Sequence, residues 1–266
     1  MLRSIPNPTV PVRGLVPVLW ARHRAFSLGS LTVSSYLITG VSRGIGQVLA
    51  QRLTADGHQV FGLVRTPASA GGLDLAGVLV ADLSMPESLE AALRPWLDSG
   101  IGLDGVVHCA GIVRGGPLAA TRPADFADQF AVNVTAVAEL TRLLLPVLCT
   151  AATVVFVNSG SGLNARPPLT SYGASKFALR AYADALRQEE PSLRVCTIYP
   201  GRTATDMQRS VRAAEAGDYD ESAYLRPGTV ADVIASMLAL PADGVITDLT
   251  LRPSGVAGPA SPDAHR

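Results

Sequence analysis

The chain has 266 residues, of which 48% are hydrophobic and 17% are charged. A chain of this length and composition can bury a large core, which excludes an intrinsically disordered protein. Its 22 basic and 22 acidic residues cancel, and no basic stripe stands out. This balance argues against a nucleic-acid partner and against an acidic polymer as substrate.

The cysteines and histidines form no metal-binding pattern. Cys109, Cys149 and Cys196 lie far apart without a CxxC pair, and the four histidines lack ligand spacing. We therefore predict no metal site. Unpaired thiols are typical of a reducing compartment, so we expect a cytoplasmic protein.

The first 33 residues differ in composition from the rest. They place arginines in a Pro-rich, weakly apolar stretch, and no acidic residue precedes Asp56. The apolar piece from Gly14 to Ala21 is too short to span a bilayer and is broken by Pro17. We interpret residues 1–33 as a poorly ordered N-terminal extension, with an organelle-targeting leader as the alternative. A membrane anchor is the least favoured interpretation.

From Ser34 onward, short β-rich runs alternate with longer amphipathic stretches. Most of the short runs are continuously apolar, which is typical of strands whose two faces are both covered by helices. The predicted strands are Ser35–Thr39, Gln59–Val64, Gly77–Ala81, Gly105–Cys109, Thr153–Asn158, Arg194–Tyr199 and Val245–Leu251. The predicted helices include Ile45–Ala55, Pro86–Asp98, Phe126–Leu148 and Ser171–Glu189.

This alternation predicts a single α/β domain over residues 34–252. The expected architecture is a Rossmann-like, doubly wound, seven-stranded parallel sheet with helices on both faces. Residues 253–266, rich in Pro, Gly, Ala and Ser, are expected to form a flexible tail. The apolar stretch Leu143–Val157 contains Pro146 and divides into a helix end and a strand, so we do not expect it to span a membrane.

A glycine-rich turn connects the first predicted strand to the first helix. Gly40, Gly44 and Gly46 stand in the segment Thr-Gly-Val-Ser-Arg-Gly-Ile-Gly that ends at Gly46. Such glycines let the backbone turn tightly and approach a pyrophosphate, which then binds at the positive end of the helix. Because a strand precedes the turn and a helix follows it, we predict a dinucleotide-binding site here.

Two arginines indicate which dinucleotide binds. Arg65 follows the second strand, at the place where a carboxylate would hold the ribose 2′-hydroxyl of NAD. Arg43 lies at a helix N-terminus, where a cation opposes the macrodipole. A bound 2′-phosphate would turn both features into favourable ion pairs, so we expect NADP(H). The alternative is that both arginines are solvated surface side chains.

A tyrosine and a lysine form the candidate catalytic pair. Tyr172 and Lys176 are four residues apart, on one face of a predicted helix. A lysine and the positive charge of an oxidised nicotinamide both favour the phenolate, so we expect them to lower the pKa of Tyr172. Lys176 is the only lysine of the chain, and its compact ammonium is not interchangeable with a guanidinium. Ser159 ends a predicted strand at the edge of the sheet where ligands bind in such folds.

The TGxxxGxG turn and the YxxxK pair, together and in this order, resemble the short-chain dehydrogenase/reductase family over roughly residues 34–252. The resemblance implies a catalytic tetrad of Asn133, Ser159, Tyr172 and Lys176. In that tetrad Ser159 polarises the substrate carbonyl, with Ser161 as the less favoured candidate, and Tyr172 is the general acid/base. Lys176 would bind the ribose hydroxyls, and Asn133 would hold a water of the proton relay.

The resemblance also implies further cofactor contacts. Asp82 and Leu83 match an adenine-contacting Asp-Leu pair, with a simple capping role for Asp82 as the alternative. His108-Cys-Ala-Gly111 replaces the usual Asn-Asn-Ala-Gly, which keeps the cofactor wall but not the sheet-stabilising asparagine. The expected cofactor contacts are Gly40, Ser42, Arg43, Gly44, Ile45, Gly46, Arg65, Asp82, Leu83, Ala110, Gly111, Tyr172, Lys176, Pro200, Gly201, Thr203 and Thr205.

The implied function is NADPH-dependent hydride transfer between the nicotinamide and a small carbonyl or alcohol substrate. The alternative substrate class is a 3-oxoacyl thioester of lipid or polyketide metabolism. A non-catalytic NADP-binding sensor is less favoured because the tetrad is intact. The segment from Arg202 to Pro227 is expected to cover the substrate. A homodimer or homotetramer is expected, without a membrane or nucleic-acid partner.

Overall fold

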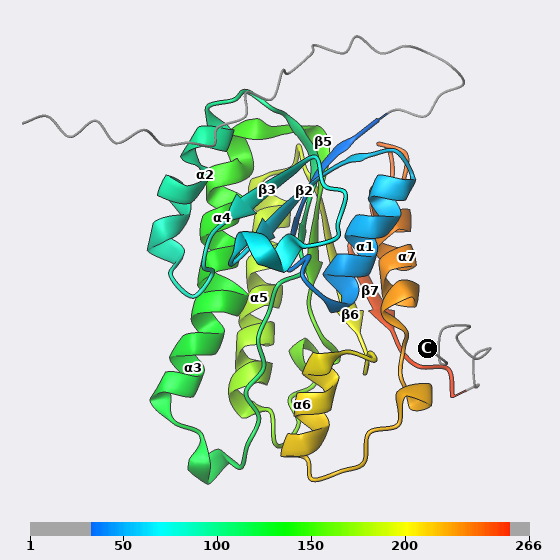
Figure 1. Ribbon diagram of the computed structural model, residues 1–266. Helices are drawn as coiled ribbons and strands as arrows, with labels where there is room; N and C mark the ends of the chain where they lie inside the picture. Colours follow the sequence, from blue (N-terminus) through cyan, green and yellow to red (C-terminus); the bar gives the residue numbers. More distant parts are fainter. Residues whose placement is uncertain (1–32, 256–266) are drawn as a thin grey trace, which may run out of the picture. The chain divides into compact units, whose positions relative to one another are not determined.

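The computed structural model describes residues 33–255. The predictions for residues 1–32 and 256–266 lie outside this range. In the described part, seven strands form one sheet in the order β3-β2-β1-β4-β5-β6-β7, and every neighbouring pair is parallel (Figure 1). This arrangement confirms the predicted doubly wound parallel sheet.

The strands agree closely with the predicted runs, and the differences lie at their ends. They are β1 (Ser35–Thr39), β2 (Gln59–Val64), β3 (Gly77–Val80), β4 (Leu103–His108), β5 (Leu148–Val157), β6 (Arg194–Pro200) and β7 (Asp248–Leu251). The largest difference is at β5, which begins at Leu148 rather than Thr153. Leu148 pairs with Leu103 of β4, so the chain enters the sheet directly after the turn at Pro146.

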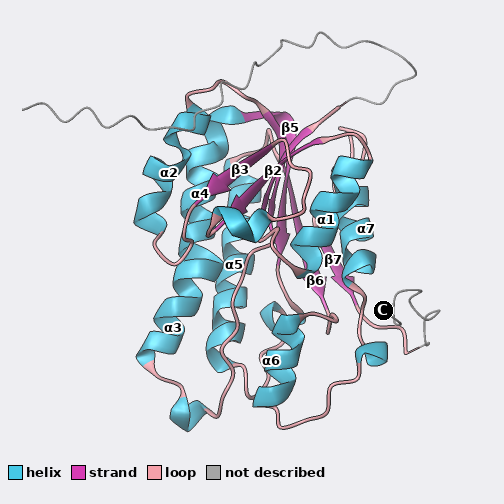
Figure 2. Ribbon diagram, viewed as in Figure 1, coloured by secondary structure: helices cyan, strands magenta, loops and turns pink. Residues whose placement is uncertain are grey.

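Helices cover both faces of the sheet (Figure 2). They are α1 (Gly44–Ala55), α2 (Leu89–Leu97), α3 (Pro123–Phe130), α4 (Ala136–Leu144), α5 (Thr170–Glu189), α6 (Asp206–Ala214) and α7 (Pro227–Leu238). On one face, α1 and α7 lie side by side and bury Leu49 and Ile234. On the other face, α2 and α4 bury Leu93 and Leu140. Because helices cover both faces of the sheet, the strands are apolar along most of their length.

The predicted helix Phe126–Leu148 is not one regular helix. It begins earlier, at Pro123, and a π-helical turn over Ala131–Thr135 separates α3 from α4. The buried Asn133 lies in that turn, where its amide bonds outside the helix. An apolar periodicity cannot reveal such a turn, because π-bulges insert a residue without changing the character of the helix faces.

The combined helical stretch Pro123–Val147 is long and apolar enough to cross a membrane by length and composition, with a mean hydropathy of 1.4. Its apolar side chains have another partner in the domain. Leu140 and Leu144 of α4 are fully buried in the core against Leu103 and Val106 of β4. The hydropathy of this stretch is therefore explained by its place on the sheet, as for a core helix.

The carboxyl ends of the central strands meet at one edge of the sheet. The glycine-rich turn follows β1, Cys109–Gly111 follows β4, Ser159 follows β5 and Gly201 follows β6. In a doubly wound sheet this edge is where a ligand-binding crevice forms.

Candidate active site

An open pocket of about 1320 Å³ lies at this edge of the sheet. It is larger than the roughly 300–1,000 Å³ typical of sites for single small molecules, so it has room for a dinucleotide together with a substrate. Its lining includes the following residues of the sequence-based prediction: Gly40, Ser42, Arg43, Gly44, Ile45, Gly46, Arg65, Asp82, Leu83, Ala110, Gly111, Ser159, Ser161, Tyr172, Lys176, Pro200, Gly201, Thr203 and Thr205. Of the predicted site residues, Asn133 alone does not line the pocket and lies behind its wall.

The turn after β1 has the geometry of a phosphate cradle. Gly40 and Gly44 adopt φ angles of +74° and +60°, which side chains other than glycine rarely tolerate. A Cβ on Gly46 would stand 2.4 Å from the carbonyl oxygen of Gly40. The first turn of α1 has no side-chain cap and no acidic residue, so its N–H groups are free to bind an anion. These residues fit the pyrophosphate of a dinucleotide.

Thr39 links the glycine-rich turn to the chain that follows β4. Its Oγ1 accepts hydrogen bonds from the N–H groups of Cys109 and Ala110, each at 3.0 Å. The side chain is 2% exposed, so the bonds are shielded from water. Thr39 thereby fixes the chain that runs to Gly111 beside the glycine-rich turn, where a Cβ on Gly40 would stand 2.9 Å from the backbone of Ala110.

Thr39→Val should lower the free energy of unfolding by about 2 kcal/mol, because the substitution keeps the shape but leaves the Ala110 N–H without its acceptor. Urea unfolding measures this change. Thr197→Val is the matched control, since the Thr197 hydroxyl is buried in β6 without a partner. Its removal should leave stability unchanged or raise it. Equal losses in the two variants would contradict the assigned role of Thr39.

The two arginines expected near a 2′-phosphate both line the pocket but differ in their surroundings. Arg43 lies 3.6 Å from Asp206, and both side chains are largely exposed. Arg65 stands near Asp82, whose pKa is lowered first by hydrogen bonds from Ser84 and to a smaller extent by the Arg65 charge. Each arginine therefore lines the pocket with a carboxylate nearby, Asp206 for Arg43 and Asp82 for Arg65, and a 2′-phosphate would compete with these carboxylates for the two cations.

Asp82 has a local structural role as well. Its carboxylate accepts from the backbone N–H of Ser84 at 2.9 Å and from its hydroxyl at 2.7 Å. These bonds form a local turn rather than a helix cap, because the N-cap residue of the following short helix is Met85. The side chain still lines the pocket beside Leu83, so turn formation and a ligand contact are compatible.

Ser159, Tyr172 and Lys176 meet in the inner part of the pocket. Ser159 follows β5, and its Oγ accepts from the Ser161 N–H at 3.1 Å. Tyr172 is 7% exposed and Lys176 is 4% exposed, both on the first turns of α5. The Lys176 Nζ donates to the Val157 carbonyl at 3.0 Å and lies 5.9 Å from the centre of the Tyr172 ring. The helical spacing thus brings the predicted pair to one place.

The expectation that Lys176 and an oxidised nicotinamide together lower the pKa of Tyr172 concerns the protein with its cofactor bound and stays a prediction. Burial raises the pKa of Tyr172 above its ordinary value, and its hydrogen bond with Ser159 opposes this only in part. Burial also lowers the pKa of Lys176 itself to about 8. The Lys176 ammonium donates to the Val157 carbonyl, and burial is the largest cause of the raised pKa of Tyr172.

Asn133 positions the wall beside this group. Its Oδ1 accepts from the Ile112 N–H at 2.9 Å, and its Nδ2 donates to the Ile112 carbonyl at 3.0 Å and to the Ser175 Oγ at 3.0 Å. The amide is therefore fully used, which explains a polar side chain that is 1% exposed. It connects the π-turn, the chain after β4 and α5 in one network next to Gly111.

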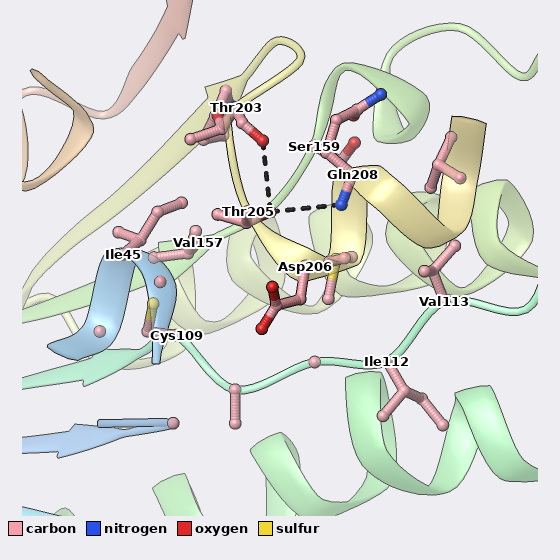
Figure 3. A pocket seen from close by; sticks show the side chains of 18 of the residues that line it. Ile45, Cys109, Ile112, Val113, Val157, Ser159, Thr203, Thr205, Asp206 and Gln208 are labelled. Carbon is pink, nitrogen blue, oxygen red and sulfur yellow. Dashed lines mark hydrogen bonds between the residues drawn. The ribbon is translucent and has the colours of Figure 1, made fainter. Parts of the chain in front are cut away.

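The loop after β6 forms another wall of the pocket, and Figure 3 shows Thr203 and Thr205 in it. The Thr203 Oγ1 donates to the Gly201 carbonyl at 3.0 Å, and the Thr205 Oγ1 donates to the Thr203 carbonyl at 3.2 Å. Thr205 also caps α6 by accepting from the Gln208 N–H at 3.3 Å. A Cβ on Gly44 would approach the Thr205 methyl group to 3.3 Å, so this loop closes onto the glycine-rich turn.

His108 is the first residue of the segment His-Cys-Ala-Gly that stands where the resemblance implies Asn-Asn-Ala-Gly. Its ring stacks on Phe156 with centroids 5.1 Å apart, and its Nε2 hydrogen-bonds with the Thr141 hydroxyl at 3.0 Å. Burial lowers the pKa of His108 to about 3, so the ring is neutral. A different residue thus links β4, β5 and α4, behind the pocket rather than in it.

Three functional contacts had no counterpart in the sequence-based prediction: Thr39 as acceptor, Ser175 in the Asn133 network and Gln208 in the pocket wall. Thr39 and Ser175 stand inside the recognised motifs, so their positions were visible although their partners were not. Gln208 lies in the segment from Arg202 to Pro227, which was expected to cover the substrate without any single residue of α6 being predicted as a contact. Its partners depend on how α6 folds over the sheet edge, which no local pattern encodes.

Comparison with known proteins identifies the family of the chain. The family described as short chain dehydrogenase matches residues 35–216. The uncharacterized oxidoreductase YbbO of Escherichia coli K12 is 33% identical over 207 residues, which cover 73% of this chain and 75% of YbbO. The 3-oxoacyl-[acyl-carrier-protein] reductase FabG of Vibrio cholerae is 28% identical over 232 residues, covering 82% and 95% of the two chains.

A solved structure agrees as well. A short-chain dehydrogenase from Escherichia coli CFT073, complexed with NADPH, superposes with a TM-score of 0.74 at 26% identity. The similarity covers 82% of this chain and 95% of the other. With the fold, the cradle and the family match in agreement, the chain belongs to the short-chain dehydrogenase family and is an oxidoreductase that works with a nicotinamide cofactor.

Proposed function

We propose that the protein is an NADPH-dependent carbonyl reductase in which Tyr172 is the general acid. The observation that carries the proposal is the meeting of Ser159, Tyr172 and Lys176 in one pocket with a phosphate cradle at its other end. The cofactor supplies the hydride when bound, and the protein supplies orientation and electrostatics. The substrate is a small carbonyl compound, or its alcohol in the reverse direction.

The two hydroxyls have separate tasks. Ser159 donates a hydrogen bond to the carbonyl oxygen as negative charge develops there. Tyr172 transfers its proton from the phenolic Oη to the same oxygen. The raised pKa of Tyr172 keeps this proton in place until the reaction needs it. Tyr172 is buried, which limits the access of competing water to its hydroxyl.

Lys176 and Asn133 assist the proton transfer without contacting the substrate carbonyl. Lys176 binds the ribose hydroxyls, and in the alcohol-oxidising direction its charge stabilises the phenolate. Asn133 fixes the chain around Ile112, beside which a water can pass a proton toward Lys176. Both roles follow the family resemblance, and the buried positions of the side chains are consistent with them.

Incubation with NADPH and a panel of ketones, aldehydes and acyl thioesters tests the proposal. We expect NADPH oxidation with members of the first two groups. A preference for acyl thioesters would favour the second candidate, a 3-oxoacyl-thioester reductase, which the similarity to the Vibrio cholerae enzyme supports. Tight NADPH binding without turnover of any compound would favour a non-catalytic sensor instead.

Arg65→Asp should weaken NADPH binding about 10- to 100-fold and leave NADH binding unchanged or improved, because the 2′-phosphate loses a cation and meets a carboxylate. Fluorescence titration of both nucleotides measures this. Arg94→Asp is the control: Arg94 is an exposed arginine of α2 outside the pocket, and its replacement makes the same change in net charge. Equal affinity of the wild-type protein for NADPH and NADH would refute NADP specificity.

We further propose a cytoplasmic oligomer. Cys109, Cys149 and Cys196 are free thiols, as in a reducing compartment. Phe177 is 41% exposed on α5, and an exposed aromatic on a long helix suits a contact with a second copy. Light scattering would measure the number of subunits in the oligomer.

A further inference from the structure

Gln208 is the buried pocket residue whose polar group has no partner. It stands on the first turn of α6, and its side chain is 8% exposed. Its Nε2 is buried and makes no hydrogen bond. Within residues 33–255, the other buried side-chain atoms without a partner belong to Thr54, Trp96, His108, Thr153 and Thr197. None of those residues lines the pocket, whereas Gln208 does.

A buried donor without an acceptor is unfavourable, and in native structures such a group calls for an explanation. Gln208 is held in place by its own backbone, since its N–H bonds to the Thr205 Oγ1 at 3.3 Å. Figure 3 shows Gln208 one turn from Thr205, in the part of the pocket where Ser159 lies. The amide therefore belongs to the substrate side of the pocket rather than to the adenosine side near Arg65.

The charges on this side favour a neutral acceptor. Arg202 is paired with Glu215 at 2.8 Å, and Arg114 is paired with Asp128 at 3.0 Å. Apolar side chains complete the lining around Gln208, among them Ile112, Val113, Leu169, Met207 and Val211. An amide donor set among paired charges and apolar groups suits a carbonyl, ester or hydroxyl oxygen. Arg166 is exposed at the same pocket, and a carboxylate would be its ligand.

We propose that Gln208 is a specificity-determining residue that donates a hydrogen bond from Nε2 to a second, uncharged oxygen of the substrate. The substrate class is then a carbonyl compound with another oxygen close to the reacting carbonyl, such as a diketone, a keto ester or a hydroxyketone. The inference rests on the proposed reductase function and narrows its substrate. It adds a contact that fixes which part of the molecule faces Ser159 and Tyr172.

The test compares matched substrates in wild-type protein and in Gln208→Met, which keeps the length of the side chain but removes the donor. The probes are 2,3-pentanedione against 2-pentanone, ethyl 3-oxobutanoate against 2-hexanone, and pyruvate as the keto acid. We expect the wild type to prefer the two-oxygen compound of each pair. Gln208→Met should lower kcat/KM about 10- to 100-fold for those compounds, largely through KM, and change the monoketones less than threefold.

Two controls separate this role from a structural one. Gln188→Met makes the same replacement on the exposed face of α5, where the Gln188 Nε2 bonds only to the Asp184 carbonyl, and should change no kcat/KM. The urea midpoint of Gln208→Met should be equal to or above that of the wild type, because the unpartnered donor is removed. An equal fall for both members of each pair would overturn the inference and assign Gln208 a structural role.

The remaining outcomes are also decisive. A preference for pyruvate that survives Gln208→Met would overturn the inference in favour of recognition by Arg166. Equal kcat/KM for the paired substrates in the wild type would overturn it while leaving the reductase function intact. If the wild type oxidised NADPH with none of the five compounds nor with any member of the wider panel, the proposed function would fail and the inference with it.

Discussion

Tyr172→Phe should reduce kcat for carbonyl reduction by about 10²- to 10⁴-fold, because the substitution removes the proton donor and leaves the ring in place. The affinity for NADPH should change by less than threefold, since no pyrophosphate contact is touched. Steady-state NADPH oxidation gives the first quantity and fluorescence titration the second. Together they separate loss of chemistry from loss of binding.

Tyr182→Phe is the matched control for this change. Tyr182 stands on the same helix as Tyr172, packs edge-on against Phe156 and does not line the pocket. Its replacement removes the same hydroxyl from α5 and should leave kcat within a factor of about two. Turnover by Tyr172→Phe at the wild-type rate would show that another group delivers the proton.

Gly46→Ala should weaken NADPH binding at least about tenfold and destabilise the fold by about 1–3 kcal/mol. The added Cβ would stand 2.4 Å from the Gly40 carbonyl oxygen, a backbone atom that cannot turn aside like a flexible side chain. The turn must open, which displaces the free N–H groups at the start of α1. Fluorescence titration and urea unfolding measure the two effects.

Gly228→Ala is the control for this prediction. Gly228 lies in the first turn of α7, its φ is not positive, and a Cβ there would meet no heavy atom within 4 Å. Alanine also has the higher helix propensity, so stability should stay the same or rise. Unaltered NADPH affinity in Gly46→Ala would mean that the turn does not cradle the pyrophosphate.

The parts of the site that could be predicted are those encoded by short spacings. Three glycines within an eight-residue segment between a strand and a helix define the cradle. The four-residue spacing alone places Tyr172 and Lys176 on one face of a helix. Alternation of apolar runs with amphipathic stretches was sufficient to predict the seven-stranded sheet. Each of these features depends on residues that are close in the chain.

The parts that could not be predicted depend on contacts across the fold. The amide of Asn133, in the π-helical turn, bonds to Ile112 and Ser175, which are 21 and 42 residues away. The pKa of Tyr172 is raised by burial, which distant segments of the chain provide, and the hydrogen bond with Ser159 opposes this. Gln208 is buried because α6 folds over the sheet edge. Periodicity carries no information on such distances.

The most direct test of the central claim follows the hydride itself. NADPH carrying deuterium at both positions of its nicotinamide C4 is incubated with the protein and a ketone from the panel, and the product is analysed by mass spectrometry. If this pocket reduces carbonyls as proposed, the alcohol carries one deuterium on the carbon that was the carbonyl carbon, and Tyr172→Phe forms little of it. An alcohol without deuterium, or deuterated alcohol formed equally by Tyr172→Phe, would contradict the account.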